Sequence, residues 1–286
     1  TDQTVNIYSA FLQNEWKNDR WGILIGGRLD KHNMVDNVIF SPRANLRFNP
    51  TQNINLRLSY SSGFRAPQAF DEDMHIENVG GTVAMIERAK DLKEEKSQSF
   101  SVSADMYHRF GAFQTNLLIE GFYTRLTDVF VLGKPYDRGD GILVKTRSNG
   151  PGAKVMGLTL EGKVAYLSIL QIQAGLTLQR SRYDEPHKWH DDAPAEKKIF
   201  RTPDTYGYFT ATCTPIKPLS IALSGTYTGR MLVQRMDITA ENAELGKMPE
   251  RKAEAIRTPR FFDLGVKLAY DFKLYKTVDL QLNGGV

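Results

Sequence analysis

The stretch NINLRLSYSSGFRAPQAFDEDMHIE, residues 53–77, decides the fold. Apolar and polar residues alternate strictly in its first half, so that one face would carry Ile54, Leu56, Leu58 and Tyr60. A period of two predicts a β-strand with one apolar face and one hydrated face. Pro67 cannot donate a backbone hydrogen bond, and we therefore expect strand pairing to stop near it. A long polar segment rich in acidic residues follows.

The same alternation recurs along the whole chain. It predicts twelve antiparallel strands, over 5–16, 20–30, 40–49, 53–65, 99–106, 113–124, 142–167, 170–179, 204–213, 219–229, 264–271 and 278–283. The run 142–167 is long for one strand, and the residues 149–152 (NGPG) inside it could form either a hairpin turn or a bulge. We favour a bulge, because a turn there would put the following long connections on the wrong side of the sheet.

Long and short connections alternate between these strands. We expect the long ones, 65–95, 133–141, 184–202 and 230–257, to lie together at one end of the sheet. The short turns, 17–19, 49–53, 108–112, 214–218 and 272–276, should lie at the other end. Long loops at one end and tight turns at the other are typical of a transmembrane antiparallel barrel.

Composition narrows the possibilities further. The 286 residues are 41% hydrophobic and 24% charged, and the net charge of +4 is too small to indicate nucleic-acid binding. No run of eighteen apolar residues predicts a transmembrane helix, and the first residues do not resemble a signal peptide. The single Cys213 excludes an internal disulfide framework. Because the chain begins and ends inside strand-like patterns, we expect it to be a fragment.

Two all-β architectures fit the alternation. A soluble sandwich also has strands with one polar face. Here, however, the polar faces carry Gln, Asn, Ser and charged residues in strand after strand. The apolar faces have aromatic residues near the strand ends, namely Trp21, Tyr60, Phe113, Tyr123, Tyr166, Tyr227 and Tyr270. Aromatic girdles at two membrane interfaces produce this arrangement, so the pattern favours a membrane barrel.

Four motifs, in this order, carry a family resemblance. They are SPRANLRFNP (41–50), SGFRAP (62–67), DLKEEKSQSF (91–100) and PGAKVMGLTLEGK (151–163). Together they resemble the barrel of TonB-dependent outer-membrane receptors, over essentially the whole chain. The resemblance implies an all-β, antiparallel, up-and-down transmembrane β-barrel, of which residues 1–286 would form a single partial domain. About twelve strands of a 22-stranded barrel would be present, while the plug domain and the final strand would be absent.

The resemblance also implies a function. Such a receptor lies in the outer membrane of a Gram-negative bacterium, in contact with lipid, and imports a scarce nutrient. The TonB complex powers it through an N-terminal region that is missing here. The motifs are closest to those of receptors for ferric siderophores and cobalamin, and we expect a ferric siderophore as the ligand. Cobalamin, haem or a glycan remain alternatives within the family, and a passive porin-like channel or an outer-membrane hydrolase are alternatives outside it.

The candidate site residues follow from the expected mouth of the barrel. Polar and aromatic residues on the long connections would contact the ligand there, and we select Arg65, His75, Tyr136, Arg138, Trp189, Arg230 and Arg235. Arginine suits an anionic iron chelate because it forms charge-assisted hydrogen bonds. For Arg65 we favour another role, an ion pair with an acidic residue of the wall or plug.

No catalytic motif stands out. The sequence has no Gly-x-Ser-x-Gly, HExxH or phosphate-binding glycine loop, and we therefore expect no enzyme and no cofactor. His187, Trp189, His190, Asp191 and Asp192 form a cluster that could ligate a metal, but an exposed polar loop is the favoured interpretation.

Overall fold

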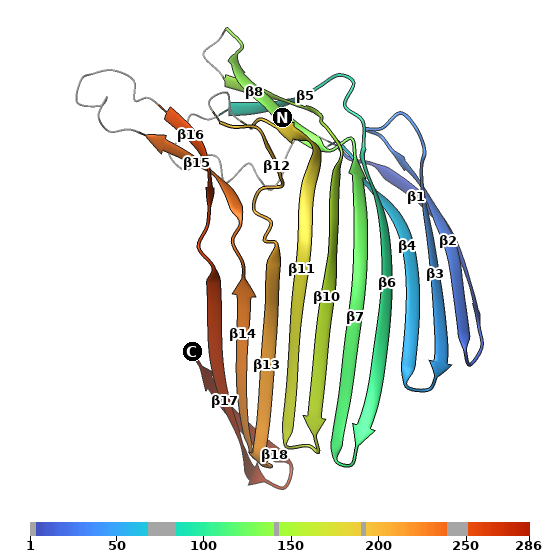
Figure 1. The fold of residues 1–286 in the computed structure, drawn as a ribbon, viewed down its shortest axis with the longest axis vertical. Coiled ribbons are helices and arrows are strands. Elements are labelled where there is room, and N and C mark those ends of the chain that lie inside the picture. The colour runs from blue at the N-terminus through green and yellow to red at the C-terminus, as the bar shows by residue number, and fades with distance from the viewer. Residues whose placement is uncertain (1–3, 68–83, 140–142, 190–192, 239–250) are drawn as a thin grey trace.

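A single curved antiparallel sheet organises the computed structural model, which describes residues 4–67, 84–139, 143–189, 193–238 and 251–286 (Figure 1). The sheet has thirteen strands, and twelve of them follow one another in unbroken order. In that order the twelve strands are β1 (Ile7–Lys17), β2 (Trp21–His32), β3 (Ile39–Thr51), β4 (Ile54–Arg65), β6 (Glu95–Phe110), β7 (Phe113–Thr127), β10 (Ala153–Tyr166), β11 (Leu170–His187), β13 (Thr205–Ile216), β14 (Leu219–Thr228), β17 (Phe261–Tyr275) and β18 (Val278–Gly285). The short strand β12 (Glu196–Lys198) pairs with β11 only. This confirms the all-β, up-and-down antiparallel fold.

No helix in the described part of the chain is long and apolar enough to cross a membrane.

The two ends of the sheet differ as the alternation of connections predicts. The connections 33–38, 66–94, 128–152, 188–204 and 229–260 all follow strands that run upward in Figure 1, and we call this the loop end. At the opposite turn end, the strands are joined by two or three residues, as at 18–20, 52–53, 111–112, 167–169, 217–218 and 276–277.

The prediction that residues 142–167 form one strand with a bulge is wrong, and the alternative of a hairpin turn at 149–152 is wrong as well. The first part is β9 (Leu143–Asn149), which lies in a separate sheet between β8 (Phe130–Asp137) and β5 (Ala84–Arg88). Only β10 belongs to the large sheet, where it pairs with β7 and β11. The segment 149–152 is therefore a crossing between two sheets at the loop end, and alternation alone cannot reveal that a strand changes partners there.

All four predicted long loops contain strand residues. The connection expected as the loop 65–95 contains β5, and the one expected as the loop 184–202 begins inside β11 and contains β12. The connection expected as the loop 133–141 begins inside β8, and the connection expected as the loop 230–257 forms a hairpin of β15 (Leu232–Ile238) and β16 (Arg251–Arg257). The sheet that contains β8 and the hairpin of β15 and β16 both stand above the large sheet, here called the wall, at the loop end (Figure 1). Within the described residues, the loop end is thus built largely from hydrogen-bonded strands.

The two faces of the large sheet have opposite character. On β11, Thr177 and Ser181 are buried, whereas Ile172 and Leu176 are 40% and 42% exposed. Side chains crowd together on the concave side of a curved sheet, so the polar set lies on the concave face, here called the inner face, and the apolar set on the convex outer face. Gln173 on the inner face donates hydrogen bonds to Glu161 Oε1 (3.0 Å) and Tyr208 Oη (2.6 Å). The register places Val266, Leu264 and Leu268 on the outer face and Asp263 and Lys267 on the inner face.

Aromatic residues form two rows on the outer face. Near the turn end, Trp21 stacks on Phe48 with ring centroids 4.3 Å apart, and Phe113 packs on Tyr166 at 4.7 Å. Nearer the loop end, Tyr60 packs on Phe100 at 4.8 Å, and Phe100 is paired with Tyr123. Phe113 and Tyr123 lie on one strand, ten residues apart, which corresponds to about 34 Å along the strand and about 26 Å along a barrel axis tilted by about 40°. An apolar band of about 25 Å is what a transmembrane barrel requires.

Candidate ligand-binding mouth

The loop end gathers most of the residues selected as ligand contacts. Arg65, Tyr136 and Arg138 lie on or beside β4 and β8, and Trp189, Arg230 and Arg235 lie on the connections that follow β11 and β14. His75 lies outside the described residues, as do His190, Asp191 and Asp192 of the second cluster. The structure therefore arranges the described members in two groups, one around β8 and one around β15.

Arg65 contacts Glu95 and Phe130 at the loop end of the large sheet. It ends β4 on the inner face, opposite Glu95 of β6, and its Nη2 lies 3.1 Å from Glu95 Oε2. Its guanidinium also lies over the ring of Phe130, 4.8 Å from the centroid. Glu95 Oε2 accepts a third contact from the backbone N–H of Phe130 at 3.0 Å. The wall acid that we expected for Arg65 is therefore Glu95, and this group fixes the first residue of β8 on the rim.

Tyr136 and Arg138 converge on one carboxylate. Tyr136 Oη donates to Glu87 Oε2 at 3.4 Å, and Arg138 Nη1 lies 3.6 Å from Glu87 Oε1. All three side chains are 43–46% exposed. Exposed ion pairs contribute only about 0–1 kcal/mol to stability, so a ligand anion can displace Glu87 from Arg138 at small cost.

Asn149 connects the three-stranded sheet of β5, β9 and β8, here called the small sheet, to the wall. Its Nδ2 donates to the carbonyl oxygens of Lys93 (3.0 Å) and Asp128 (2.8 Å), while its Oδ1 accepts the backbone N–H of Lys93 at 2.8 Å. The next residue, Gly150, must be glycine because a Cβ there would lie 2.6 Å from Val131 Cγ1. One amide side chain therefore joins three segments of the mouth.

Replacing Asn149 by alanine should loosen this mouth without unfolding the wall. Three hydrogen bonds are lost, each worth about 0.5–1.5 kcal/mol. We expect faster amide hydrogen exchange in 84–93 and 128–139, and unchanged exchange in β13 and β14. Unchanged protection of both mouth segments in the variant would show that Asn149 does not hold them.

The second group lies above β11 to β14. Trp189 packs edge-on against Phe200, with ring centroids 6.3 Å apart, and the backbone N–H of Arg201 donates to the carbonyl of Leu232 at 2.8 Å. That bond brings the connection carrying Trp189 next to the start of β15, on the same connection as Arg230 and Arg235, which are both exposed. His187 is half-buried, and burial lowers the pKa of its imidazole, so it adds no positive charge at neutral pH. The positive charge on these two connections comes from arginine and from lysines such as Lys188, Lys197 and Lys198.

Several residues of the mouth escaped the sequence analysis. Glu87, Glu95 and Phe130 complete the contacts of the selected residues, and Asn149 and Phe200 position them. Glu95 lies inside the motif DLKEEKSQSF, so the sequence offered a reason to consider it. No sequence motif points to Glu87 or Phe130, because their contacts depend on the small sheet that the alternation did not reveal.

Comparisons with known proteins agree with this architecture. The model of a family described as TonB dependent receptor-like, beta-barrel, matches residues 1–286. A search of curated proteins finds no match.

Among solved structures, the FrpB iron transporter from Neisseria meningitidis is similar with a TM-score of 0.65 and 15% identity, over 98% of this chain and 40% of that one. The siderophore receptor PirA from Acinetobacter baumannii has a TM-score of 0.68 and 14% identity, over 98% and 41%. A mutant of the ferric enterobactin receptor PfeA from Pseudomonas aeruginosa has a TM-score of 0.68 and 17% identity, over 98% and 39%. The chain thus spans about two fifths of the length of these proteins.

Proposed function

Because this chain belongs to the family of TonB-dependent receptor-like β-barrels, we propose that it forms part of an outer-membrane receptor that binds and imports a ferric siderophore. The family consists of receptors rather than enzymes. The protein would lie in the outer membrane of a Gram-negative bacterium, with the loop end facing the exterior and the outer face of the sheet in lipid. Residues 1–286 would supply a single partial barrel domain, and a plug and a final strand would complete it.

One observation in particular supports an anionic iron chelate as the ligand. Arginine and aromatic side chains meet at the loop end, where Arg65 lies over Phe130, and where Arg138 and Tyr136 contact the same carboxylate, that of Glu87. A ferric siderophore is commonly an anion with flat conjugated or chelating groups, and arginine can bind such an anion while aromatic rings stack on it. The similar solved structures include proteins named as an iron transporter and siderophore receptors, which supports the same ligand class.

The energy for import would come from the TonB complex. Ligand bound at the mouth must pass through the barrel, and the inner face offers a hydrated wall for a plug to pack against. The cross-strand network of Gln173, Glu161 and Tyr208 is one such polar patch. TonB would act on the N-terminal region that precedes this barrel section in the family.

The arginines of the second group test the ligand class. We expect that replacing both Arg230 and Arg235 by alanine in the full-length receptor weakens binding of an anionic ferric siderophore at least tenfold. Each arginine supplies a charge-assisted hydrogen bond, worth about 1.5–3 kcal/mol to a charged ligand. Isothermal titration of the purified receptor measures the change.

A matched control removes the same charge at the other end. Lys217 and Lys276 lie in exposed turns at the turn end, and their double alanine variant should bind the siderophore like the parent. Both variants should reach the cell surface normally, since loop substitutions usually change stability by less than about 0.5 kcal/mol. Equal affinity in the two double variants would remove Arg230 and Arg235 from the site.

A further inference from the structure

The outer face near the loop end changes character in three successive rows. Strand register aligns these rows across β4, β6, β7, β10 and β11, and paired residues on neighbouring strands point to the same face. The lowest row is Leu58, Val102, Gly121, Leu158 and Leu178. The next is Tyr60, Phe100, Tyr123, Met156 and Arg180. The uppermost is Ser62, Gln98, Arg125, Lys154 and Arg182, which Lys198 of β12 extends by pairing with Arg182. Apolar, aromatic and basic rows thus succeed one another at intervals of about 7 Å.

The basic row has an excess of positive charge. Asp184 holds Arg125 through contacts of 2.6 and 2.7 Å and lies 3.8 Å from Lys154 Nζ. Asp204 accepts a contact from Lys198 Nζ at 2.5 Å. Arg180 and Arg182 are exposed, and neither makes an ion pair within the part of the chain that the structure describes. Two carboxylates therefore face the four cations of this row, and together with Arg180 of the row below, three positive charges remain.

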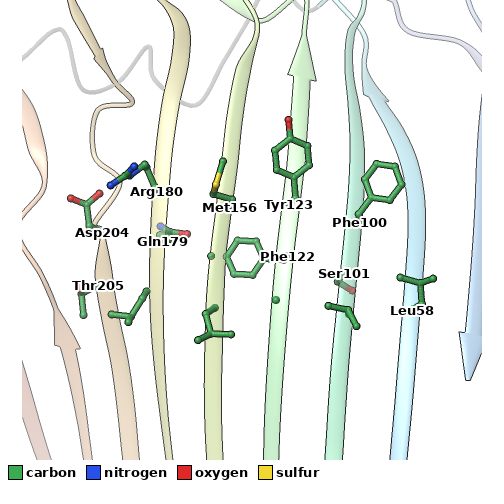
Figure 2. A pocket seen from close by; sticks show the side chains of 15 residues that line it. Leu58, Phe100, Ser101, Phe122, Tyr123, Met156, Gln179, Arg180, Asp204 and Thr205 are labelled. Carbon is green, nitrogen blue, oxygen red and sulfur yellow. The ribbon is translucent and has the colours of Figure 1, made fainter. Parts of the chain in front are cut away.

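An apolar groove runs directly below these cations. It has a volume of about 730 Å³ and is lined by Leu58, Val102, Leu158 and Leu178 under Phe100 and Tyr123. Figure 2 shows Arg180 and Asp204 beside one end of this groove, and Phe100, Tyr123 and Met156 along its upper side. The hollow exists because Gly121 has no side chain. A Cβ at Gly121 would meet only Val102 Cγ1, at 3.7 Å, which is ordinary van der Waals contact.

We propose that this surface binds a membrane lipid with a phosphate-bearing headgroup, the phosphate on the basic row and an acyl chain in the groove. The inference rests on the membrane location proposed above, but not on the substrate. A free anion would leave the apolar groove unfilled, and a neutral lipid would leave the three excess positive charges without a counter-charge. A phosphorylated lipid complements both.

The geometry favours a specific contact over general attraction to the membrane surface. The Asp184 carboxylate, itself held by Arg125, lies 3.8 Å from Lys154 Nζ and so restrains the lysine side chain, which reduces the side-chain entropy lost when a phosphate binds. Arg180 stands one row lower, beside Met156, at the boundary between the groove and the basic row. A phosphate there can contact Lys154, Arg180 and Arg182 together, because these residues lie on two neighbouring strands.

The test uses the purified full-length receptor in phosphatidylcholine nanodiscs, titrated with diphosphoryl lipid A and followed by native mass spectrometry. The variant Arg180→Gln with Arg182→Gln removes two cations of the outer face. The matched control, Arg57→Gln with Lys267→Gln, removes two cations of the inner face. Gly121→Leu fills the groove without changing charge. Heat-modifiability on gels checks that each variant is folded.

We expect the outer-face double variant to bind diphosphoryl lipid A at least tenfold more weakly, and the inner-face control to bind it within twofold of the parent. Gly121→Leu should also weaken binding, and the parent should bind the monophosphoryl form less tightly. Equal affinities for the two double variants, or no loss in the outer-face variant, overturn the proposal. Siderophore affinity in the same nanodiscs should be equal in the parent and in the outer-face variant. If the parent itself binds no siderophore, the proposed substrate is contradicted, whereas the lipid site is not.

Discussion

A Val266→Arg receptor should fail to accumulate in the outer membrane. Val266 lies on the outer face of β17, midway between Phe262 and Tyr270, which belong to the two aromatic ends of the outer face. A lipid-facing arginine at mid-bilayer costs about 2–4 kcal/mol, a large part of the 5–15 kcal/mol by which native proteins are typically stable. The side chain cannot reach either interface easily from the midpoint, so relief by bending toward the headgroups is limited.

The measurement is the amount of folded receptor in isolated outer membranes, judged by heat-modifiability on gels. Ala269→Arg is the matched control, because Ala269 is three residues away on the same strand but faces inward, opposite Ser220. We expect the control to assemble and Val266→Arg to be depleted severalfold. Normal assembly of Val266→Arg would mean that this face does not contact lipid.

Gly157→Ala should destabilise the wall by about 1–3 kcal/mol, the range that overpacking typically costs. A Cβ at this position of β10 would lie 2.5 Å from the carbonyl oxygen of Leu178 on β11 and 2.6 Å from Phe122 Cζ on β7. The ring could rotate away, but the carbonyl belongs to a paired strand and cannot move without opening the ladder. The contact with this carbonyl oxygen therefore cannot be relieved without disturbing the pairing of β10 with β11.

Gly162 provides the control on the same strand, since a Cβ there meets nothing within 4 Å. Gly162→Ala should be neutral or slightly stabilising, because alanine restricts the unfolded chain more than glycine does. Urea unfolding of both variants in detergent, followed by tryptophan fluorescence, compares them. Equal midpoints for the two would contradict the packing described here around Gly157.

Strand periodicity predicted the wall well, for a physical reason. On the wall strands one face meets the outer surroundings and the other the polar inner side, so the alternation in 53–65 and 170–179 is strong and matches β4 and β11. Above the wall this two-sided environment ends. Residues 143–149 look like the start of β10, yet they pair with β8 and β5, because Asn149 and Gly150 redirect the chain.

The mouth was harder to predict than the wall. Its arginines and tyrosine could be selected from their residue types and their places on long connections. Their partners could not, because Tyr136 meets Glu87 across 49 positions of sequence and Asn149 meets Lys93 across 56. Such contacts depend on how separate connections fold onto one another, and local patterns do not encode this. The basic row on the outer face became visible only when the strand register aligned Arg125, Lys154 and Arg182.

Uptake of radiolabelled iron tests the central claim most directly. Cells that lack the full-length receptor, with and without a copy restored on a plasmid, are offered a panel of ferric siderophores under iron starvation, with cobalamin and haem as comparisons. The account predicts that the restored cells take up at least one ferric siderophore, that the deficient cells do not, and that dissipating the proton gradient abolishes the uptake. Uptake that is independent of the receptor, that persists without the gradient as in a passive channel, or that is confined to cobalamin or haem would contradict it.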